Sequence, residues 1–474
     1  MKDSIQQIAV KMVERVLEIL QNEGISSVGE TVLRMQPVAN EAVLEIVSAA
    51  IEQIDAAVVA ASRERKADGL RIQQRDVPRT VSTQLGELRY ARTYFETADG
   101  GYCYPTDTLI GVSAYERLTK ELCAELVQQA ATTSMEKAAK NTGIAVSRQT
   151  VNNKVLALRQ VVTEAERVQE TPKELHLFAD EDHVHMHSGR SAIVPLVTVT
   201  EGIDCTSKRH RTIHAVHFEG YGMENGAFLE SLAAFLYEKY DMEQVERIYL
   251  HGDGGAWMER AMDVFPGVIR VMDGFHLQKR FRKLSHLKGA LPYMGAVYRS
   301  IRENDFTTFV DYCVRIDRQQ DEIGHAQLKE QINFMQNRWE AIVNRMQNEV
   351  CGSCTEPLVS HVLSERLSRN PLAWSEDGLR QMAMLRVYTQ NGGVVTAKDV
   401  RVSRSKAERS NDKAALHDGF ARYRQYADKQ IDAFLNVKRD WSVFETPSPR
   451  FGKLDGTGML LAAFGRDHGV LPSA

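Results

Sequence analysis

The chain has 474 residues, 43% of them hydrophobic and 26% charged, with a formal net charge of −4. This length exceeds what one ordinary hydrophobic core organises, so we expect about three domains in a globular protein. No apolar run of about 18 residues and no disulfide framework exist, which excludes a membrane-spanning chain and a small disulfide-stapled one. The amphipathic, acid-containing N-terminus argues against a signal peptide, and we expect a cytoplasmic protein.

The N-terminal part predicts helices followed by a small β unit. Apolar residues recur at helical spacing over 4–22 and again over about 38–64, where they indicate core packing or a dimer face. Residues 79–107 alternate as strands do and contain a turn-forming Ala-Asp-Gly-Gly sequence. We therefore assign 1–75 to an N-terminal helical region and 76–112 to a small β unit.

The next segment has the layout of a helix-turn-helix. A first helix ends near Gly143, and Ser147 is placed to cap a second one. The start of the second helix carries side chains of the types that read base edges in a major groove, namely Arg148, Gln149, Asn152 and Asn153. Two packed helices with polar caps would give the same pattern without DNA. The prediction is a helix-turn-helix DNA-binding domain over 113–170.

Residues 171–276 predict a mixed α+β core. Three strand-like segments, HLFADEDHVHMHS, IVPLVTVTEGIDC and RTIHAVHFEGYG, are followed by a helix, the strand RIYLHGD, a second helix and the strand VIRVMDGFH. Three antiparallel strands followed by αβαβ is the layout of a ribonuclease-H-like domain. In such a sheet the first strand is central and the fourth lies beside it, which predicts that Asp180 and Asp253 are adjacent.

A helical pattern over 277–350 predicts an all-helical insertion, after which 351–390 returns to the core and 391–474 forms a polar, helical tail. The insertion begins with a basic helix whose predicted DNA contacts are Lys279, Arg280, Arg282 and Lys283. A second basic stretch occupies 401–413. Phosphate contacts require only local basic surfaces, so the net charge of −4 does not exclude nucleic-acid binding. Solvated helix faces or loops would also explain both stretches.

Three acids are the candidate catalytic and metal-binding residues: Asp180, Asp253 and Glu356. Two follow strand-like segments, and Glu356 begins a predicted helix. Carboxylate oxygens are the ligands that Mg²⁺ prefers, and two ions about 4 Å apart can assist phosphoryl transfer. Competing assignments remain open. Asp182 shares a strand face with Asp180, Asp253 could cap a helix, and the rivals of Glu356 are Glu340, Glu349 and Glu365.

Asp273 and His276, in the segment MDGFH, are candidate supporting residues together with Asp182. Asp273 and His276 would support leaving-group chemistry or hold a DNA strand near the metals, and Asp182 would orient a water or a ligand. Alternatively, Asp273 caps the following helix. His183, His185 and His187 form HxH pairs, but no further zinc ligands are evident nearby.

In this order, the motifs ADEDHVH, YLHGDGGAW, DGFH and CTEPLVSHVLSERLSRNPLAW resemble the ISLre-two family of insertion-sequence transposases. The upstream LGELRYARTYF, YPTDTLIGV and GIAVSRQTVNNKV segments also look like that family, so the resemblance covers most of residues 80–390. The chain departs from it in two places. Glu181 follows the first Asp where the family often has Gly, and Pro357 follows the last acid where many members have Gly.

The resemblance implies a DDE transposase with a ribonuclease-H-like core and a helical insertion before the last acid. Asp180, Asp253 and Glu356 would be the triad that holds two Mg²⁺ or Mn²⁺ ions, and Asp273 and His276 match a D-x-x-H signature. The partners would be double-stranded DNA, as terminal inverted repeats and target, and further copies of the chain in a dimer or higher oligomer. In the cell we expect association with the nucleoid when DNA is bound. The alternatives are a non-catalytic DNA-binding protein derived from a transposase and a metal-dependent nuclease.

Overall fold

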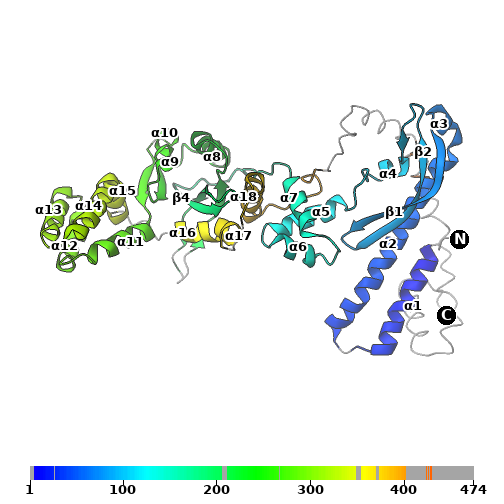
Figure 1. Cartoon of the computed structure of the whole chain (residues 1–474), viewed down its shortest axis with the longest axis horizontal. Helices are drawn as coiled ribbons and strands as arrows, with labels where there is room; N and C mark the ends of the chain where they lie inside the picture. The colour runs from blue at the N-terminus through cyan, green and yellow to red at the C-terminus, as the bar shows by residue number, and fades with distance from the viewer. Residues whose placement is uncertain are drawn as a thin grey trace. The chain divides into compact units, whose positions relative to one another are not determined.

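The computed structural model describes most of the chain before residue 402. The described residues are 5–25, 27–204, 206, 211–265, 267–347, 354–369, 373–401, 423, 425, 428 and 429. The chain divides into two compact units (Figure 1). The first comprises Met1–Leu126, Ala139–Val146 and Thr396–Ala474, and the second comprises Val127–Ala138 and Ser147–Val395.

The first unit contains helices and a small antiparallel sheet. Its elements are α1 (Ile5–Glu23), α2 (Val28–Ala60), α3 (Ser62–Ala67), β1 (Arg71–Thr83), β2 (Gly86–Glu96), β3 (Tyr102–Cys103), α4 (Pro105–Leu109) and most of α5 (Lys120–Ala130). α2 begins about ten residues before its predicted start and contains Pro37 inside it. A proline usually ends or kinks a helix, so the sequence pattern indicated a later start.

The small sheet packs on α2 through both apolar and polar contacts. Phe95 of β2 is buried with Val58 and Leu70. Asp55 of α2 accepts hydrogen bonds from the backbone N–H and the hydroxyl of Thr93, at 2.8 and 2.6 Å. These bonds satisfy a carboxylate that faces the sheet, which burial would otherwise make costly. The small β unit was therefore correctly predicted, and its strands begin at Arg71 rather than at residue 76.

Among the described residues of the second unit, five strands form one mixed sheet in the order β10-β9-β4-β5-β8. β4 pairs antiparallel with β5 and parallel with β9, β5 pairs antiparallel with β8, and β9 pairs parallel with β10. The strand bounds are β4 (Glu174–His185), β5 (Ser191–Thr200), β6 (Ile203–Asp204), β7 (Arg211–Thr212), β8 (Val216–Glu219), β9 (Arg247–Gly252) and β10 (Ile269–Met272). The predicted central position of the first strand, with the fourth beside it, is confirmed.

Two predicted core elements are interrupted. The third strand-like segment is split into β7, which pairs with β6 in a two-stranded sheet of the described residues, and β8, which joins the main sheet. His214 lies between them with a positive φ of 47°, a backbone geometry that no continuous strand contains. The predicted second helix consists of two short pieces, α9 (Ala256–Glu259) and α10 (Ala261–Val264).

The faces of the main sheet differ in chemistry. Leu175, Leu177 and Ala179 of β4 point into a core that α8 (Asn225–Lys239) covers. Because side chains alternate along a strand, Asp180 and Asp182 lie on the opposite face. This face carries the candidate functional residues.

Helices follow the last strand, as the predicted insertion requires. They are α11 (Gly274–Ser285), the 3₁₀ helix η1 (Leu291–Tyr293), α12 (Met294–Arg302), α13 (Phe306–Asp317), α14 (Glu322–Asn337) and α15 (Trp339–Gln347). They enclose a hydrophobic core of their own that includes Phe309, Cys313 and Leu328. α15 packs back against β10 of the sheet.

The remaining helices lie on either side of this insertion in the sequence. The two helices of the predicted helix-turn-helix are α6 (Met135–Asn141) and α7 (Arg148–Leu156). After the insertion come α16 (Thr355–Val359), the π-helical turn η2 (Ser360–Ser364), α17 (Glu365–Leu367) and α18 (Glu376–Gln390). Within the described residues we find no helix with both the length and the apolar character needed to span a membrane. From residue 402 onward only four positions are described, so the tail and most of the 401–413 stretch fall outside the described residues.

Replacing Leu232 by Ala tests the packing of α8 on the sheet. Leu232 is fully buried in the core beneath β4, and a Leu→Ala change at such a site costs about 2–5 kcal/mol. We expect a lower melting temperature for the second unit, followed by the fluorescence of Trp257, Trp339 and Trp374, which all lie in it. Tyr237→Ala on the same helix is the control, because its side chain is 63% exposed. Equal melting temperatures of the two variants would contradict the burial of Leu232 in this core.

Candidate metal centre

The parallel strands β4, β9 and β10 bring three acids to one edge of the sheet. Phe178 of β4 pairs with His251 of β9, and two residues further along each strand come Asp180 and Asp253. Met272 of β10 pairs with Gly252, and Asp273 follows directly. The ends of parallel strands that share a direction meet at one edge, so the fold places these acids together although they are distant in sequence.

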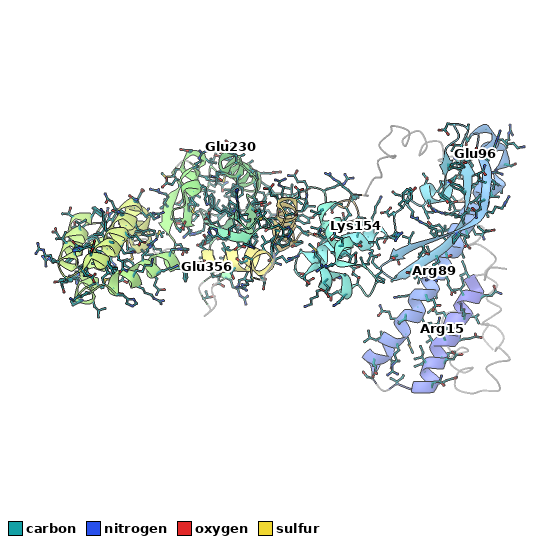
Figure 2. The ribbon with its side chains drawn as sticks, viewed as in Figure 1. Arg15, Arg89, Glu96, Lys154, Glu230 and Glu356 are labelled. Atoms are coloured by element: carbon teal, nitrogen blue, oxygen red, sulfur yellow. The ribbon has the colours of Figure 1, made fainter. Side chains whose placement is uncertain are left out.

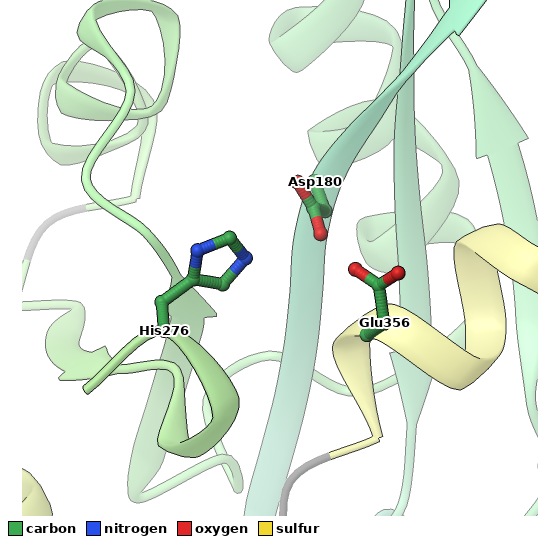
Figure 3. Close-up of side chains that lie close together, drawn as sticks. All are labelled: Asp180, His276 and Glu356. Carbon is green, nitrogen blue, oxygen red and sulfur yellow. The ribbon is translucent and has the colours of Figure 1, made fainter. Parts of the chain in front are cut away.

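Asp180, His276 and Glu356 converge beyond that edge (Figure 3). Each offers one ligand atom, and these atoms all lie within 4.8 Å of one another. In Figure 3 the carboxylates of Asp180 and Glu356 face each other, and the imidazole of His276 approaches from the other side. Asp180 is buried, His276 is partly buried and Glu356 is exposed. The cluster is therefore accessible to solvent on the Glu356 side.

The ionised form of Asp180 is disfavoured in this position. Burial is the largest of the effects that together raise the pKa of its carboxyl from 3.8 to about 6, and the nearby charges of Asp253 and Glu356 act in the same direction. The backbone N–H of Glu181 and the imidazole of His276 act in the opposite direction and lower the pKa. A buried carboxylate beside two other acids gains from a bound cation, because a cation offsets both the desolvation and the repulsion.

Local helix geometry positions His276. Asp273 is the N-cap of α11, and its Oδ1 accepts hydrogen bonds from the backbone N–H groups of Phe275 and His276 at 3.0 and 3.1 Å. The helix-cap interpretation of Asp273 is thus the observed one. By fixing the first turn of α11, the cap orients the imidazole toward Asp180. His276, predicted as a supporting residue, lies in the cluster itself.

Glu356 lies in the first turn of α16, as predicted, and Pro357 occupies an early helical position where no N–H is needed. Two of its rivals are engaged elsewhere. Glu340 lies 3.2 Å from Arg270, and Glu365 lies 3.0 Å from Arg386. Glu349, the third rival, falls outside the described residues.

Asp253 is close to the cluster but is not one of its members. Its Oδ1 accepts a hydrogen bond from the backbone N–H of Gly255 at 2.9 Å. The loop is anchored by Arg338 of the helical insertion, which donates to the carbonyl oxygens of Asp253 and Gly254 at 2.7 and 3.1 Å. Gly254 has a φ of +82°, and a Cβ there would lie 2.6 Å from Arg338 Nε, so this position requires glycine.

Asp182 does not belong to the cluster, and its carboxylate is hydrogen-bonded to other side chains. Its Oδ1 accepts from the hydroxyls of Ser364 and Ser368 at 3.0 and 2.9 Å. Both serines belong to the segment that follows Glu356 in the chain. Of the two acids left open by the sequence, Asp180 is therefore the one that meets Glu356 and His276.

All four predicted base-reading residues lie on α7. Ser147 caps α7 as predicted, with its side chain accepting from the N–H of Thr150 at 3.2 Å. Arg148, Gln149 and Asn153 are exposed, and Asn152 is partly exposed. The side chains of Gln149 and Asn153 are joined by a hydrogen bond of 2.9 Å. The opposite side of α7 is buried, and α7 packs against α18.

The basic helix α11 divides into two sides. Lys279, Arg282 and Lys283 are exposed. Arg280 instead lies 2.7 Å from Glu330 and stacks over the ring of Phe334, which anchors α11 to α14. Three of the four predicted contacts are therefore available at the surface.

The donor set of the cluster fits a divalent cation. Two carboxylates and one imidazole are ligands that Mn²⁺ accepts, and carboxylates alone suit Mg²⁺. Asp180, Glu356 and His276 would hold one ion. A second ion would need Asp253, whose carboxylate is engaged with its own loop in this structure.

Comparison with known proteins places this chain in a family. It matches the Uncharacterised protein family (UPF0236) over residues 20–405, which is most of the chain. The chain belongs to the UPF0236 family. Two UPF0236 proteins of Caldanaerobacter subterraneus subsp. tengcongensis are 30% and 31% identical to it, covering 82% and 80% of this chain and 84% and 81% of their own lengths. A UPF0236 protein in the vanSb 3'region of Streptococcus gallolyticus is 21% identical over 66% of this chain and 73% of its own length.

Sequence reasoning did not identify the residues that support the cluster. Arg338, which holds the Asp253 loop, is the C-cap of α14 and lies between two ordinary amphipathic helices. Ser364 and Ser368, which bind Asp182, lie within the motif CTEPLVSHVLSERLSRNPLAW, but nothing in that motif indicates a contact with Asp182. The D-x-x-H spacing was a usable signal for His276, because it places Asp at an N-cap and His in the first turn.

Replacing Asp180 by Asn tests the electrostatics of the cluster. Because the folded protein binds the Asp180 proton more tightly than the unfolded chain does, the ionised carboxylate costs stability above about pH 6. The cost disappears as the pH falls toward 3.8, where the unfolded chain is protonated too. In metal-free buffer at about pH 7.5 we expect Asp180→Asn to stabilise the second unit by about 1–3 kcal/mol.

The gain from Asp180→Asn should shrink toward zero near pH 4, measured as the difference in melting temperature from the parent. Glu230→Gln, on the exposed surface of α8 (Figure 2), is the control. It should leave the melting temperature unchanged both at about pH 7.5 and near pH 4. A destabilised Asp180→Asn variant at neutral pH would contradict the buried, charge-crowded position of this carboxyl.

Proposed function

We propose that this chain is a DNA transposase of an insertion sequence, which cuts and joins DNA at terminal inverted repeats by divalent-metal-dependent phosphoryl transfer. The observation that carries the proposal is the convergence of Asp180, Glu356 and His276 at the edge of the mixed sheet. Asp253 lies near enough to raise the pKa of Asp180. An acid cluster that is open to solvent on one side suits a phosphodiester, which must approach bound cations.

The strand order supports a ribonuclease-H-like core within the same proposal. The first strand, β4, is central in the five-stranded sheet. The antiparallel strands β5 and β8 continue the sheet on one side of it, and β9 and β10, which run parallel to β4, continue it on the other. The candidate residues come from the first strand, the loop after the fourth, the helix after the fifth, and a helix beyond the insertion. This is the arrangement that the resemblance to ISLre-two transposases implies for a triad of Asp180, Asp253 and Glu356.

Each residue has a role that its position supports. Asp180 and Glu356 supply carboxylate oxygens, and His276 supplies a ring nitrogen that the cap at Asp273 keeps oriented. Asp253 would turn from Gly255 toward the cluster to complete a second site. Bound Mg²⁺ or Mn²⁺ ions would polarise the attacking oxygen and stabilise charge on the leaving oxygen. No covalent link between protein and DNA is required.

The relatives add a second line of support. The name of one UPF0236 relative joins eleven locus designations of a single strain, and the name of another joins four. A protein present at many loci of one genome is expected for a mobile element and is unusual for a metabolic enzyme.

DNA contact would involve two surfaces. The exposed start of α7 would read the terminal repeats through base edges, and the exposed lysines and arginine of α11 would hold flanking phosphates. Joining two ends requires at least two copies of the chain in the active complex.

Strand cleavage and joining in Mn²⁺ on a labelled duplex from the end of the encoding element is the decisive measurement. Asp180→Asn, Asp253→Asn and Glu356→Gln should each lower both products by more than about a hundredfold, because each removes a charged ligand. Binding of the same duplex should stay within a few-fold of the parent. Glu230→Gln is the matched acid-to-amide control and should retain activity.

The products distinguish the alternatives. Joined products from the parent support a transposase. Cleavage without joining of a pre-cut end would instead identify a metal-dependent nuclease. Specific binding without either reaction would identify a non-catalytic DNA-binding protein.

Arg148→Ala and Asn152→Ala test base reading by α7. Loss of a base contact costs about 1–3 kcal/mol of specific binding and leaves non-specific binding nearly unchanged. Lys279→Ala with Lys283→Ala should instead weaken binding to all sequences and flatten its salt dependence. The measurement is a binding titration at two or more salt concentrations. Unchanged specificity of both α7 variants would leave that helix as a packing element only.

A further inference from the structure

The helix that presents Glu356 is not a regular α-helix. After α16, the backbone continues through the π-helical turn η2 and then through α17. A π turn widens the helix by one residue, and it costs helix stability unless neighbouring groups bind the displaced backbone. The π turn begins at Ser360, directly after the short helix α16 that carries Glu356, so the two form one continuous segment.

Arg386 of α18 binds the backbone of the π turn. Its guanidinium donates to the carbonyl oxygens of Val362 and His361 at 2.8 and 2.6 Å and also contacts Glu365 at 3.0 Å. Arg386 is 3% exposed. A buried guanidinium that donates its hydrogen bonds to main-chain carbonyls stabilises the irregular turn and is not available for a ligand.

Asp182 of β4 binds the same segment. Its Oδ1 accepts from Ser364, the last residue of the π turn, and from Ser368 just after α17. Asp182 is 7% exposed, and its Oδ2 has no hydrogen-bond partner among the described residues. Every side-chain hydrogen bond that this carboxylate makes there therefore goes to the segment carrying Glu356.

β4 thus meets this segment at two points. Residues two apart on a strand share a face at a separation of about 6–7 Å. Asp180 faces Glu356 at one point, and Asp182 holds Ser364 and Ser368 at the other. Strand and helix are fixed relative to each other before any cation arrives.

We propose that Asp182 is a positioning residue, which aligns Glu356 with Asp180 for divalent-cation binding by holding Ser364 and Ser368. The proposal rests on the proposed function only in that the cluster binds a divalent cation. A charged acid so close to the cluster has a second interpretation, in which Asp182 attracts or binds the cation directly. The two interpretations predict opposite results for two sets of variants.

The test is a Mn²⁺ titration of the full chain by calorimetry, with melting temperature measured in parallel. Ser364→Ala with Ser368→Ala removes both hydrogen bonds and keeps the charge of Asp182. We expect Mn²⁺ to bind about 10–100-fold more weakly to this double variant, the usual effect of losing groups that orient a metal ligand. Asp182→Asn removes the charge but keeps an oxygen that accepts both hydroxyls, so its Mn²⁺ affinity should stay within a few-fold of the parent.

Ser375→Ala is the control for a purely structural effect. Ser375 caps α18 in the same unit, with its side chain accepting from the backbone N–H of Gly378 at 3.1 Å, whereas the hydroxyls that bond Asp182 among the described residues are those of Ser364 and Ser368. This variant should melt at a lower temperature and bind Mn²⁺ as the parent does. If the double serine variant does not fold, the single variant Ser368→Ala is titrated instead. We expect it to lose less Mn²⁺ affinity than the double variant would.

Each outcome decides the proposal. Weak Mn²⁺ binding by the serine variants with near-normal binding by Asp182→Asn supports it. Unchanged affinity in the serine variants, or a larger loss in Asp182→Asn than in them, overturns it and leaves the proposed function intact. Absence of Mn²⁺ binding by the parent overturns the proposal and the proposed function together.

Discussion

The parallel pairing of β4 with β9 is the constraint on which the candidate metal centre depends. It fixes Phe178 against His251, and the same register carried two residues further brings Asp180 beside Asp253. β10 pairs parallel with β9 and adds Asp273, whose N–H donates to the carbonyl of Gly252 at 2.8 Å. A one-residue slip of β4 would turn Asp180 into the hydrophobic core and Ala179 toward Glu356. The core of Leu175, Leu177 and Ala179 therefore specifies the site as well as the fold.

Placing acids together in this way destabilises the folded state through desolvation and repulsion. Hydrogen bonds to the individual acids offset part of this free energy. Desolvation and like charges raise the pKa of Asp180 to about 6. The neighbouring acids are each satisfied separately, Asp253 by a backbone N–H, Asp182 by two hydroxyls and Asp273 by a helix start. Asp180 accepts one backbone N–H as well, from Glu181 at 2.9 Å, but its carboxylate still faces that of Glu356 and an imidazole. Such a concentration of ionisable groups is typical of functional sites, where a bound ligand can offset the repulsion.

Much of this architecture was predictable from the sequence because it follows from local periodicity. Alternation in β4, β5 and β9, the helical spacing of α8 and the Ser147 cap are properties of short segments, and all were found. The central position of β4 was also correctly predicted, since three hairpin-connected strands followed by crossover helices allow few topologies. The failures were at irregular backbone. His214 interrupts the third strand with a positive φ, and Pro37 is absorbed into α2.

The limits of prediction at the site have the same physical origin. Asp180 and Glu356 could be proposed because acids at strand ends and helix starts have recognisable contexts. The supports could not, because Arg338, Ser364 and Arg386 act through contacts made by folding between distant segments. The choice between Asp180 and Asp182 shows this clearly. Alternation puts both on one face, and only the position of the serines after Glu356 distinguishes them.

The helical insertion is structurally part of the candidate site rather than an appendage to the core. Its first helix, α11, carries His276, and its Asp273 cap is continuous with β10. Arg338, at the end of α14, holds the Asp253 loop, and α15 packs on β10. A displacement of the insertion would therefore move His276 and Asp253 together, while Asp180 and Glu356 stay fixed through β4 and the serine contacts. The two halves of the site are thus held by different parts of the unit, one by Arg338 and α11 and the other by β4 and the serines that follow Glu356.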